Sequence, residues 1–222
     1  MKVSVIIPAY NEETRINNCL QSLISQIEKA DEIIVIDNNC SDKTVQIAKN
    51  FPVRIVKEKK QGMINARNRG FDEAKYDILA RTDADTILPS DWIKKIKENF
   101  EKEKIDALTG PAIFYDITMN SKYIFILYHH FMKLIQKGKE TLSGPNMAIS
   151  KEIWKKVRND ICLDDKKVQE DIDLAIHINK AGGIIKRDDE LLIKASGRRL
   201  KSNPASFYIE YPLRLLKTFF NH

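Results

Sequence analysis

Apolar residues in the first hundred positions follow two alternating patterns. Continuous apolar runs such as "VSVIIP", "EIIVID" and "VRIVKE" are typical of strands that are covered on both faces of a sheet. The segment 12–27 instead has the 3.6-residue period of an amphipathic helix. Its expected buried face consists of Ile16, Leu20, Leu23, Ile24 and Ile27.

Three more helices and one more strand continue this alternation. Ser41 can cap a helix that reaches Lys49, a second helix covers 62–75, the strand "YDILART" follows, and Ser90 can cap a helix at 91–102. Strands that alternate with helices at this spacing form right-handed βαβ units. The sequence therefore predicts an α/β fold with a Rossmann-like, mainly parallel sheet flanked by helices.

The second half of the chain is less regular. "DALTGPAIFY" and "ETLSGPNMAIS" are expected to be strands, and the second ends near Ser150, which can cap another helix. Helices are expected at 121–137 and 168–181, followed by short strands near "IIKR" and "LLIKAS" and a C-terminal helix. Because no linker or repeat divides the chain, we expect one domain over 1–222, with a nucleotide-binding half at about 1–103.

Composition and charge restrict the class of protein. With 43% hydrophobic and 31% charged residues, the chain is typical of a globular domain. Its net charge of +6 suits an anionic ligand or an acidic membrane surface, but a solvated lysine-rich surface explains it equally. The three cysteines have no CxxC spacing, which favours a reducing compartment without disulfides or a zinc site.

The apolar segments are too short for a membrane span. The N-terminal "KVSVIIP" lacks the length and cleavage region of a signal peptide, and no run reaches about 18 apolar residues. We therefore expect a cytoplasmic protein. The aromatic, basic stretches 122–137 and 207–220 are either core helices or interfacial helices that contact the inner face of the membrane.

Polar residues follow three of the predicted parallel strands. "AYNEE" follows the first strand, Asp37 ends the second, and Asp83 and Asp85 follow the fourth. In an open parallel sheet, ligands bind beyond the carboxyl ends of the strands. Asp37 could bind a base or ribose, or it could cap the turn before the next helix.

The "DAD" tripeptide suits a metal that carries a phosphorylated ligand. Carboxylate oxygens select Mg²⁺ or Mn²⁺, which commonly also bind substrate phosphates. In extended backbone the two aspartates point to opposite sides, so one can bind the metal and the other a sugar hydroxyl. An acidic turn before the helix at Ser90 is the alternative.

Two further segments carry candidate charges for a diphosphate. "QGMINARNRG" opens a helix at Gly62 whose free N–H groups could face a phosphate, with Arg67 and Arg69 adding charge. "SGRRLKS" places Arg198 and Arg199 close together, a pattern suited to a diphosphate. In both segments, a solvated basic surface is the alternative.

An acidic cluster opens the helix "QEDIDLAIHINK". Asp171 flanks its apolar stripe, whereas Glu170 is expected to point away from it. A carboxylate at the edge of a buried face is a plausible general base, because partial desolvation raises its pKa. The helix dipole alone could also explain acidic residues in the first turn.

Taken together, these segments resemble family 2 glycosyltransferases of the GT-A fold. The resemblance rests on "VSVIIPAYNEE", "VIDNNCSD", "GMINARNRGFDEA", "RTDADT", "SGPNMAISKEIW" and "QEDIDLAIHINKAGG", which cover roughly 2–185. It implies an inverting, metal-dependent enzyme that moves a sugar from a UDP- or GDP-sugar donor to an acceptor hydroxyl. Residues 104–222 would then form the acceptor-binding half.

The resemblance also implies roles for individual residues. The nucleotide wall would comprise Pro8, Ala9, Tyr10 and Glu12. Asp37 and Arg67 would lie near the base, Asp83 would reach the ribose, and Asp85 would bind Mg²⁺ or Mn²⁺. Asn146 would line the sugar or acceptor pocket, and Glu170 would contact substrate. Asp171 would be the catalytic base, and Arg198 and Arg199 would close over the diphosphate.

The chain departs from the family pattern at one motif, where "IDNNCSD" stands in place of the usual aspartate pair. Because no QxxRW segment is present, we expect transfer of a single sugar and not polymer synthesis. The basic, aromatic stretches 122–137 and 207–220 favour a lipid-linked acceptor or a glycan of the cell envelope. A sugar-nucleotide nucleotidyltransferase and a non-catalytic nucleotide-binding adaptor are the alternatives. Nucleic acid is not an expected partner.

Overall fold

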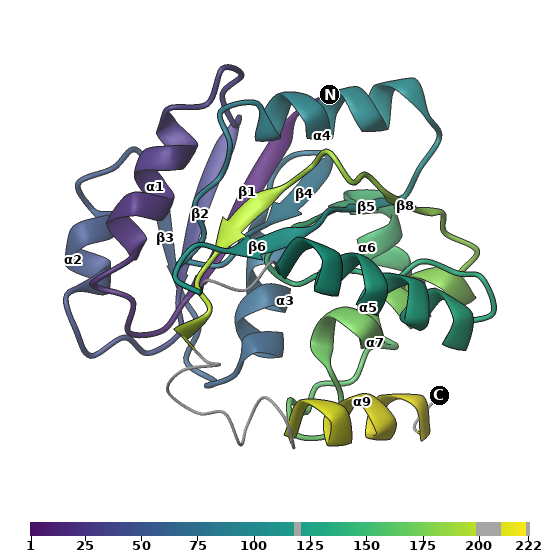
Figure 1. The fold of residues 1–222 in the computed structure, drawn as a ribbon. Helices are drawn as coiled ribbons and strands as arrows, with labels where there is room; N and C mark the ends of the chain where they lie inside the picture. The colour runs from purple at the N-terminus through teal and green to yellow at the C-terminus, as the bar shows by residue number, and fades with distance from the viewer. Residues whose placement is uncertain (118–120, 199–209, 221–222) are drawn as a thin grey trace.

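A central sheet with strand order β3–β2–β1–β4–β7–β5–β8 organises the protein (Figure 1). The structure is a computed structural model and describes residues 1–117, 121–198 and 210–220. The strands of this sheet are β1 (Val3–Ala9), β2 (Glu32–Asp37), β3 (Arg54–Lys57), β4 (Ile78–Arg81), β5 (Ala107–Thr109), β7 (Met147–Ser150) and β8 (Ile185–Arg187). A separate pair, β6 (Ala112–Phe114) and β9 (Ile193–Ala195), forms a small parallel sheet.

Helices connect most of the strands. The helices of the first half are α1 (Ile16–Ile24), α2 (Thr44–Ala48), α3 (Met63–Glu73) and α4 (Trp92–Lys102). Those of the second half are α5 (Ser121–Ile135), α6 (Lys151–Val157), α7 (Glu170–Lys180) and α9 (Tyr211–Phe220).

The first four strands of the sheet are parallel, as the βαβ pattern predicts. β1 pairs with β2 and β4 in parallel, and β2 pairs with β3 in parallel. β7 is antiparallel to both of its neighbours, β4 and β5. The prediction of an α/β fold with a mainly parallel sheet and an irregular second half is therefore confirmed.

Both faces of the sheet are covered, which explains the continuous apolar runs. On β1, Val5 and Ile7 join a core with α1 and α4, whereas Ile6 joins a second core with α3, α6 and α7. Alternate side chains of one strand thus enter opposite layers. The strand ends are thereby held at fixed positions, and polar loops emerge from them.

Several predicted boundaries change. The predicted helix 12–27 is shortened to α1, and Ile27, expected on its buried face, is exposed. The predicted strand 106–115 divides at Gly110 and Pro111 into β5 and β6, which belong to different sheets. The Ser150 cap is confirmed, because its hydroxyl accepts the N–H of Ile153 at 3.1 Å.

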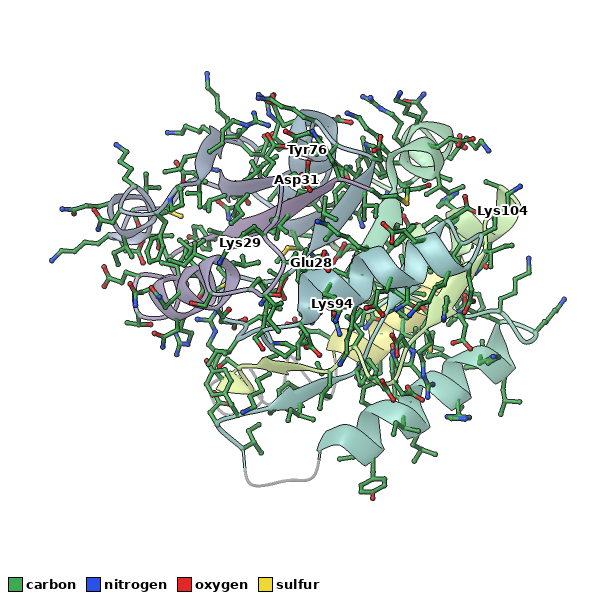
Figure 2. The ribbon with its side chains drawn as sticks, turned by 90° about the horizontal axis from the view of Figure 1, so that it is seen from above. Glu28, Lys29, Asp31, Tyr76, Lys94 and Lys104 are labelled. Atoms are coloured by element: carbon green, nitrogen blue, oxygen red, sulfur yellow. The ribbon has the colours of Figure 1, made fainter. Side chains whose placement is uncertain are left out.

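The end of the molecule at the amino ends of the strands carries both acidic and basic side chains (Figure 2). The labelled residues at this end are Glu28, Lys29, Asp31, Tyr76, Lys94 and Lys104. The predicted site residues lie instead around the carboxyl ends of the strands, at the other end of the sheet.

Candidate active site

Two adjoining cavities lie beyond the carboxyl ends of the parallel strands. The first has a volume of about 410 Å³ and the second about 320 Å³. They share Met63, Asp83 and Pro145 in their linings. A molecule in one cavity therefore lies next to a molecule in the other.

The first cavity brings together the predicted strand-end residues. β1 ends at Ala9, so the loop after it enters the cavity, and the loop after β4 enters from the neighbouring strand. The segment after β9 closes a third side. The predicted residues that line this cavity are Pro8, Ala9, Tyr10, Glu12, Asp83, Asp85 and Arg198.

Arg198 bridges two of these carboxylates. Its Nη1 donates to Glu12 Oε2 at 2.7 Å, and its Nη2 also donates to Glu12. Nη2 lies 3.5 Å from Asp85 Oδ2. A residue after β9 is thereby tied to loops of the first half, and its guanidinium compensates two negative charges. Arg199, predicted to act beside it, lies outside the described residues.

The two aspartates of "DAD" have different partners. Asp83 accepts a 2.9 Å hydrogen bond from Arg81 Nη2 and lines both cavities. Asp85 faces Arg198 in the first cavity. Asp83 therefore lies at the junction of the cavities, whereas Asp85 lies on the side of the first cavity that Glu12 also lines.

These residues fit a hard divalent cation that arrives with phosphate oxygens. Within residues 1–117, 121–198 and 210–220, no group of three or more His, Cys, Asp or Glu side chains is arranged to hold a metal alone. Mg²⁺ is usually bound through one or two carboxylates together with substrate phosphates and water. Asp85 and Glu12, which both pair with Arg198 here, would supply that number of oxygen ligands from the protein.

Asp171 lines the second cavity at the first turn of α7. Its carboxylate accepts the N–H groups of Gly144 and Ile172, both at 3.0 Å. Burial and the neighbouring charge of Glu170 raise its pKa from 3.8 to about 6, although the Gly144 hydrogen bond opposes them. A carboxylate in this state is ionised at neutral pH and accepts a proton readily.

Glu170 is held between two buried arginines. Its Oε2 accepts Arg67 Nη1 at 2.6 Å, and its Oε1 accepts Arg81 Nη1. Burial by itself would raise the pKa of Glu170, but the charges of Arg81 and Arg67 outweigh burial and lower it. The expectation that Glu170 points away from the buried face is wrong, because the two arginines draw it inward.

Arg67 lies behind the cavities, whereas Arg81 lines the second one. Arg67 is fully buried on α3 and contacts Glu170, whereas the sequence prediction placed it near the base. Arg81 was missed by sequence reasoning, although it is a charged residue at the end of the buried run "DILAR", directly before the two aspartates. It links Asp83, which lines both cavities, to Glu170 in the second cavity.

Two other predicted site residues have structural partners. Asp37 accepts the N–H of Cys40 at 2.8 Å, which matches the turn-capping alternative. The amide of Asn146 is buried, accepts Trp92 Nε1 at 2.9 Å and donates to the carbonyls of Pro111 and Leu191. Neither residue is among those that line the two cavities in the described part of the chain.

The start of α3 is also occupied. Gly62 N–H donates to Asn38 Oδ1 at 2.9 Å, and Ile64 N–H donates to Asp165 Oδ1 at 3.0 Å. The sequence suggested that N–H groups at the start of this helix could face a phosphate. These two N–H groups instead donate to side chains of the protein. Asn38 lines the first cavity, where sequence reasoning saw only the loss of an acid.

The mainly parallel sheet with carboxylates at its strand ends has the GT-A fold, and the comparisons with known proteins agree. The sequence model described as "Glycosyl transferase family 2" matches residues 4–158, more than half of the chain. The protein belongs to this family.

Relatives and solved structures support this assignment. A dolichol-phosphate mannosyltransferase of Pyrococcus furiosus is 30% identical, over 94% of this chain and 57% of the relative. The mannosyltransferase PcManGT of Pyrobaculum calidifontis, solved with GDP-Man and Mn²⁺, has a TM-score of 0.79 at 19% identity, covering 99% of this chain and 63% of that one. The structure of S. aureus TarS 1–349 with UDP-GlcNAc has a TM-score of 0.68 at 21% identity, and the match covers 89% of this chain and 59% of that one.

The chain spans about half the length of the curated relatives that it matches. Across residues 1–117, 121–198 and 210–220, no helix has the length and apolar character that a membrane crossing requires.

Proposed function

We propose that the protein transfers one sugar from a nucleotide diphosphate donor to an acceptor hydroxyl, with inversion at the anomeric carbon. The observation that carries the proposal is the position of Asp171. Its carboxylate has a raised pKa and lines a cavity that adjoins the first cavity through Asp83. Family membership and similar folds that bind GDP-Man or UDP-GlcNAc support a nucleotide-sugar donor.

The donor occupies the first cavity in this proposal. Residues 1–103 supply most of its lining, with Asp83 near the ribose and Asp85 as the ligand of Mg²⁺ or Mn²⁺. The metal would neutralise the charge of the diphosphate. Arg198 lies where its guanidinium can turn from Glu12 and Asp85 to the diphosphate oxygens, which adds electrostatic stabilisation.

The acceptor hydroxyl occupies the second cavity, formed mainly by residues 104–222. Asp171 accepts the hydroxyl proton as the acceptor oxygen attacks the anomeric carbon. The bond between that carbon and the diphosphate breaks on the opposite face, and the electron pair leaves with the diphosphate. This single displacement follows the logic of inverting glycosidases, with an acceptor oxygen in place of water.

We propose a cell-envelope glycan or a lipid-linked sugar as the acceptor, and peripheral contact with the membrane. The name of the Pyrococcus relative includes a lipid phosphate, dolichol phosphate. The apolar stretches at 122–137 and 207–220 are consistent with an acceptor at a membrane surface.

Asp171→Asn tests the proposal directly. Because amide nitrogen and oxygen are poor bases, release of UDP or GDP with transfer should fall by about 10²–10⁴-fold across a donor panel. Donor affinity, measured by calorimetry with Mn²⁺, should change less than twofold. In the wild type, the transfer rate should fall as the pH decreases through about 6, because Asp171 then binds one proton and can no longer act as the base.

Three outcomes would contradict the proposal. Normal turnover by Asp171→Asn would remove the base assignment. If the wild type binds nucleotide sugars but never releases UDP or GDP with any acceptor, the protein is a nucleotide-binding adaptor. Release of pyrophosphate from a nucleoside triphosphate and a sugar phosphate would identify a nucleotidyltransferase instead.

A further inference from the structure

The helix α5 presents an unusually apolar surface to solvent. Leu127 and Leu134 are 72% and 79% exposed. Single exposed apolar side chains are common on protein surfaces, whereas a cluster of them on one helix is not. At 3.6 residues per turn, four of its exposed side chains lie within roughly 80° of one another. They are Tyr123, Leu127, Phe131 and Leu134.

The helix α9 has the same character. Leu213, Leu216 and Phe220 are exposed and recur at intervals of three and four residues, which places them on one side of the helix. These seven side chains of α5 and α9 are called the outer face below.

The opposite sides of the two helices are already buried. Met132 of α5 packs with Ile172 and Ile176 of α7, and Leu215 and Phe219 of α9 pack against the same cluster. In Figure 1, α5 and α9 lie on the same side of the molecule, with α7 between them. A helix that is apolar on both sides needs a second apolar partner, which the rest of the described chain does not supply.

The charge around the outer face is mainly positive, although the exposed Glu210 directly before α9 pairs with Arg214 at 3.7 Å. The segment 121–139 and the helix 211–220 contain no Asp or Glu. Lys137, Lys139 and Lys217 are exposed there, and Lys133 pairs with Glu140 just beyond α5. The end of the molecule seen in Figure 2 instead mixes acids and bases. Apolar side chains bordered by lysines are the pattern of helices that lie on anionic lipid.

The outer face is adjacent to the second cavity. Arg214 of α9 lines that cavity, one position from the exposed Leu213. The helix beneath, α7, carries Asp171 at its first turn and contributes Ile172 to the cluster that supports α5 and α9. A surface that covers the outer face therefore lies close to the entrance used by the acceptor.

We infer that the outer face of α5 and α9 is a docking surface for an anionic lipid bilayer. The helices lie in the interface with their leucines and aromatic rings among the lipid chains, while the lysines contact the headgroups. This inference rests on the proposed function, since it gives the acceptor cavity its place at the membrane.

Sedimentation with vesicles tests the inference without a donor or an acceptor. The wild type should bind vesicles of phosphatidylcholine with 30% phosphatidylglycerol at least tenfold more strongly than pure phosphatidylcholine vesicles, and high salt should weaken this binding. The variant Leu127→Glu/Leu134→Glu should bind at least tenfold less. Both positions are exposed, so circular dichroism and thermal unfolding should match the wild type.

A matched control makes the same chemical change elsewhere. Ile27 and Leu163 are 69% and 56% exposed but lie outside the outer face, so Ile27→Glu/Leu163→Glu should bind vesicles like the wild type. Equal loss of binding in this control would overturn the inference. So would a wild type that binds neither kind of vesicle, or both equally.

The same variants distinguish a second copy of the chain from a bilayer. If sedimentation velocity shows a dimer that Leu127→Glu/Leu134→Glu dissociates, the outer face is a protein interface and the inference is wrong. Donor binding, measured without vesicles, should be unchanged in both variants. Loss of vesicle binding is therefore distinguishable from failure of the proposed sugar transfer.

Discussion

At the scale of single residues, the state of Asp171 has a measurable cost for the fold. Its pKa is about 6 in the folded chain, against 3.8 for an ordinary aspartate. A difference of about two pKa units corresponds to roughly 3 kcal/mol. Above pH 6 the carboxylate is charged in both the folded and the unfolded chain, and the fold is then less stable by this full amount. As the pH falls from 6 to 4 the folded state binds the proton first, so stability contributed by this group rises.

Asp171→Asn should therefore be more stable than the wild type at pH 8, by up to about 2 kcal/mol, because the amide keeps only part of the hydrogen bonding. The difference should shrink towards zero at pH 4. Urea unfolding at both pH values measures it, with the exposed Glu152→Gln as a control. An Asp171→Asn variant that is less stable at pH 8 would contradict the raised pKa.

The sequence predicted the positions of the carboxylates better than those of the arginines that pair with them. Asp83, Asp85 and Asp171 could be predicted because strand ends and helix starts follow from local periodicity. Arg67 and Arg81 could not be placed, because their contacts with Glu170 join residues about 90 to 100 positions apart. Such pairing depends on tertiary packing, which hydrophobic period alone does not specify.

At the scale of elements, Asn146 shows how one buried amide can connect segments that are distant in sequence. It bonds to Trp92 of α4, to the carbonyl of Pro111 between β5 and β6, and to the carbonyl of Leu191 before β9. The resemblance suggested a ligand contact for this residue. The three hydrogen bonds use its acceptor and both of its donors within the fold.

Asn146→Ala should destabilise the protein by about 3 kcal/mol, because it leaves buried partners without hydrogen bonds. Asn65→Ala, which removes one hydrogen bond near the surface, is the matched control and should cost under about 1 kcal/mol. Urea unfolding measures both. The donor KM of the folded Asn146→Ala variant should stay within twofold, and a KM increase without loss of stability would favour the ligand-contact role.

The predicted boundaries of helices and strands were wrong where the local sequence does not indicate a break. The segment 106–115 reads as one strand, but the chain changes sheets at Gly110, where an added Cβ would lie 2.2 Å from the Leu191 carbonyl oxygen. That close approach is imposed by the returning segment before β9, far away in sequence. The exit of Ile27 from the buried face has a similar origin, since its N–H bonds to the Ser90 carbonyl.

At the scale of the whole molecule, residues from both halves of the chain line the first cavity. Loops after β1 and β4 form one side, and the segment after β9 brings Arg198 to Glu12 and Asp85. A ligand that binds there contacts loops from both halves, so its binding should stabilise the complete fold. The protein alone supplies few metal ligands within the described residues, so metal and diphosphate should bind together.

Thermal unfolding with nucleotide and metal tests this coupling. UDP or GDP with Mn²⁺, at about 100 times the dissociation constant, should stabilise the fold by about 2.7 kcal/mol, or roughly 5–10 °C in a chain of this size. Mn²⁺ alone, or nucleotide with EDTA, should give a much smaller shift. Asp85→Asn should lose the metal-dependent part, whereas Asp91→Asn, a nearby aspartate paired with Lys95 outside the cavities, should keep it. A full shift in EDTA, or in Asp85→Asn, would show that the metal does not couple the nucleotide to Asp85.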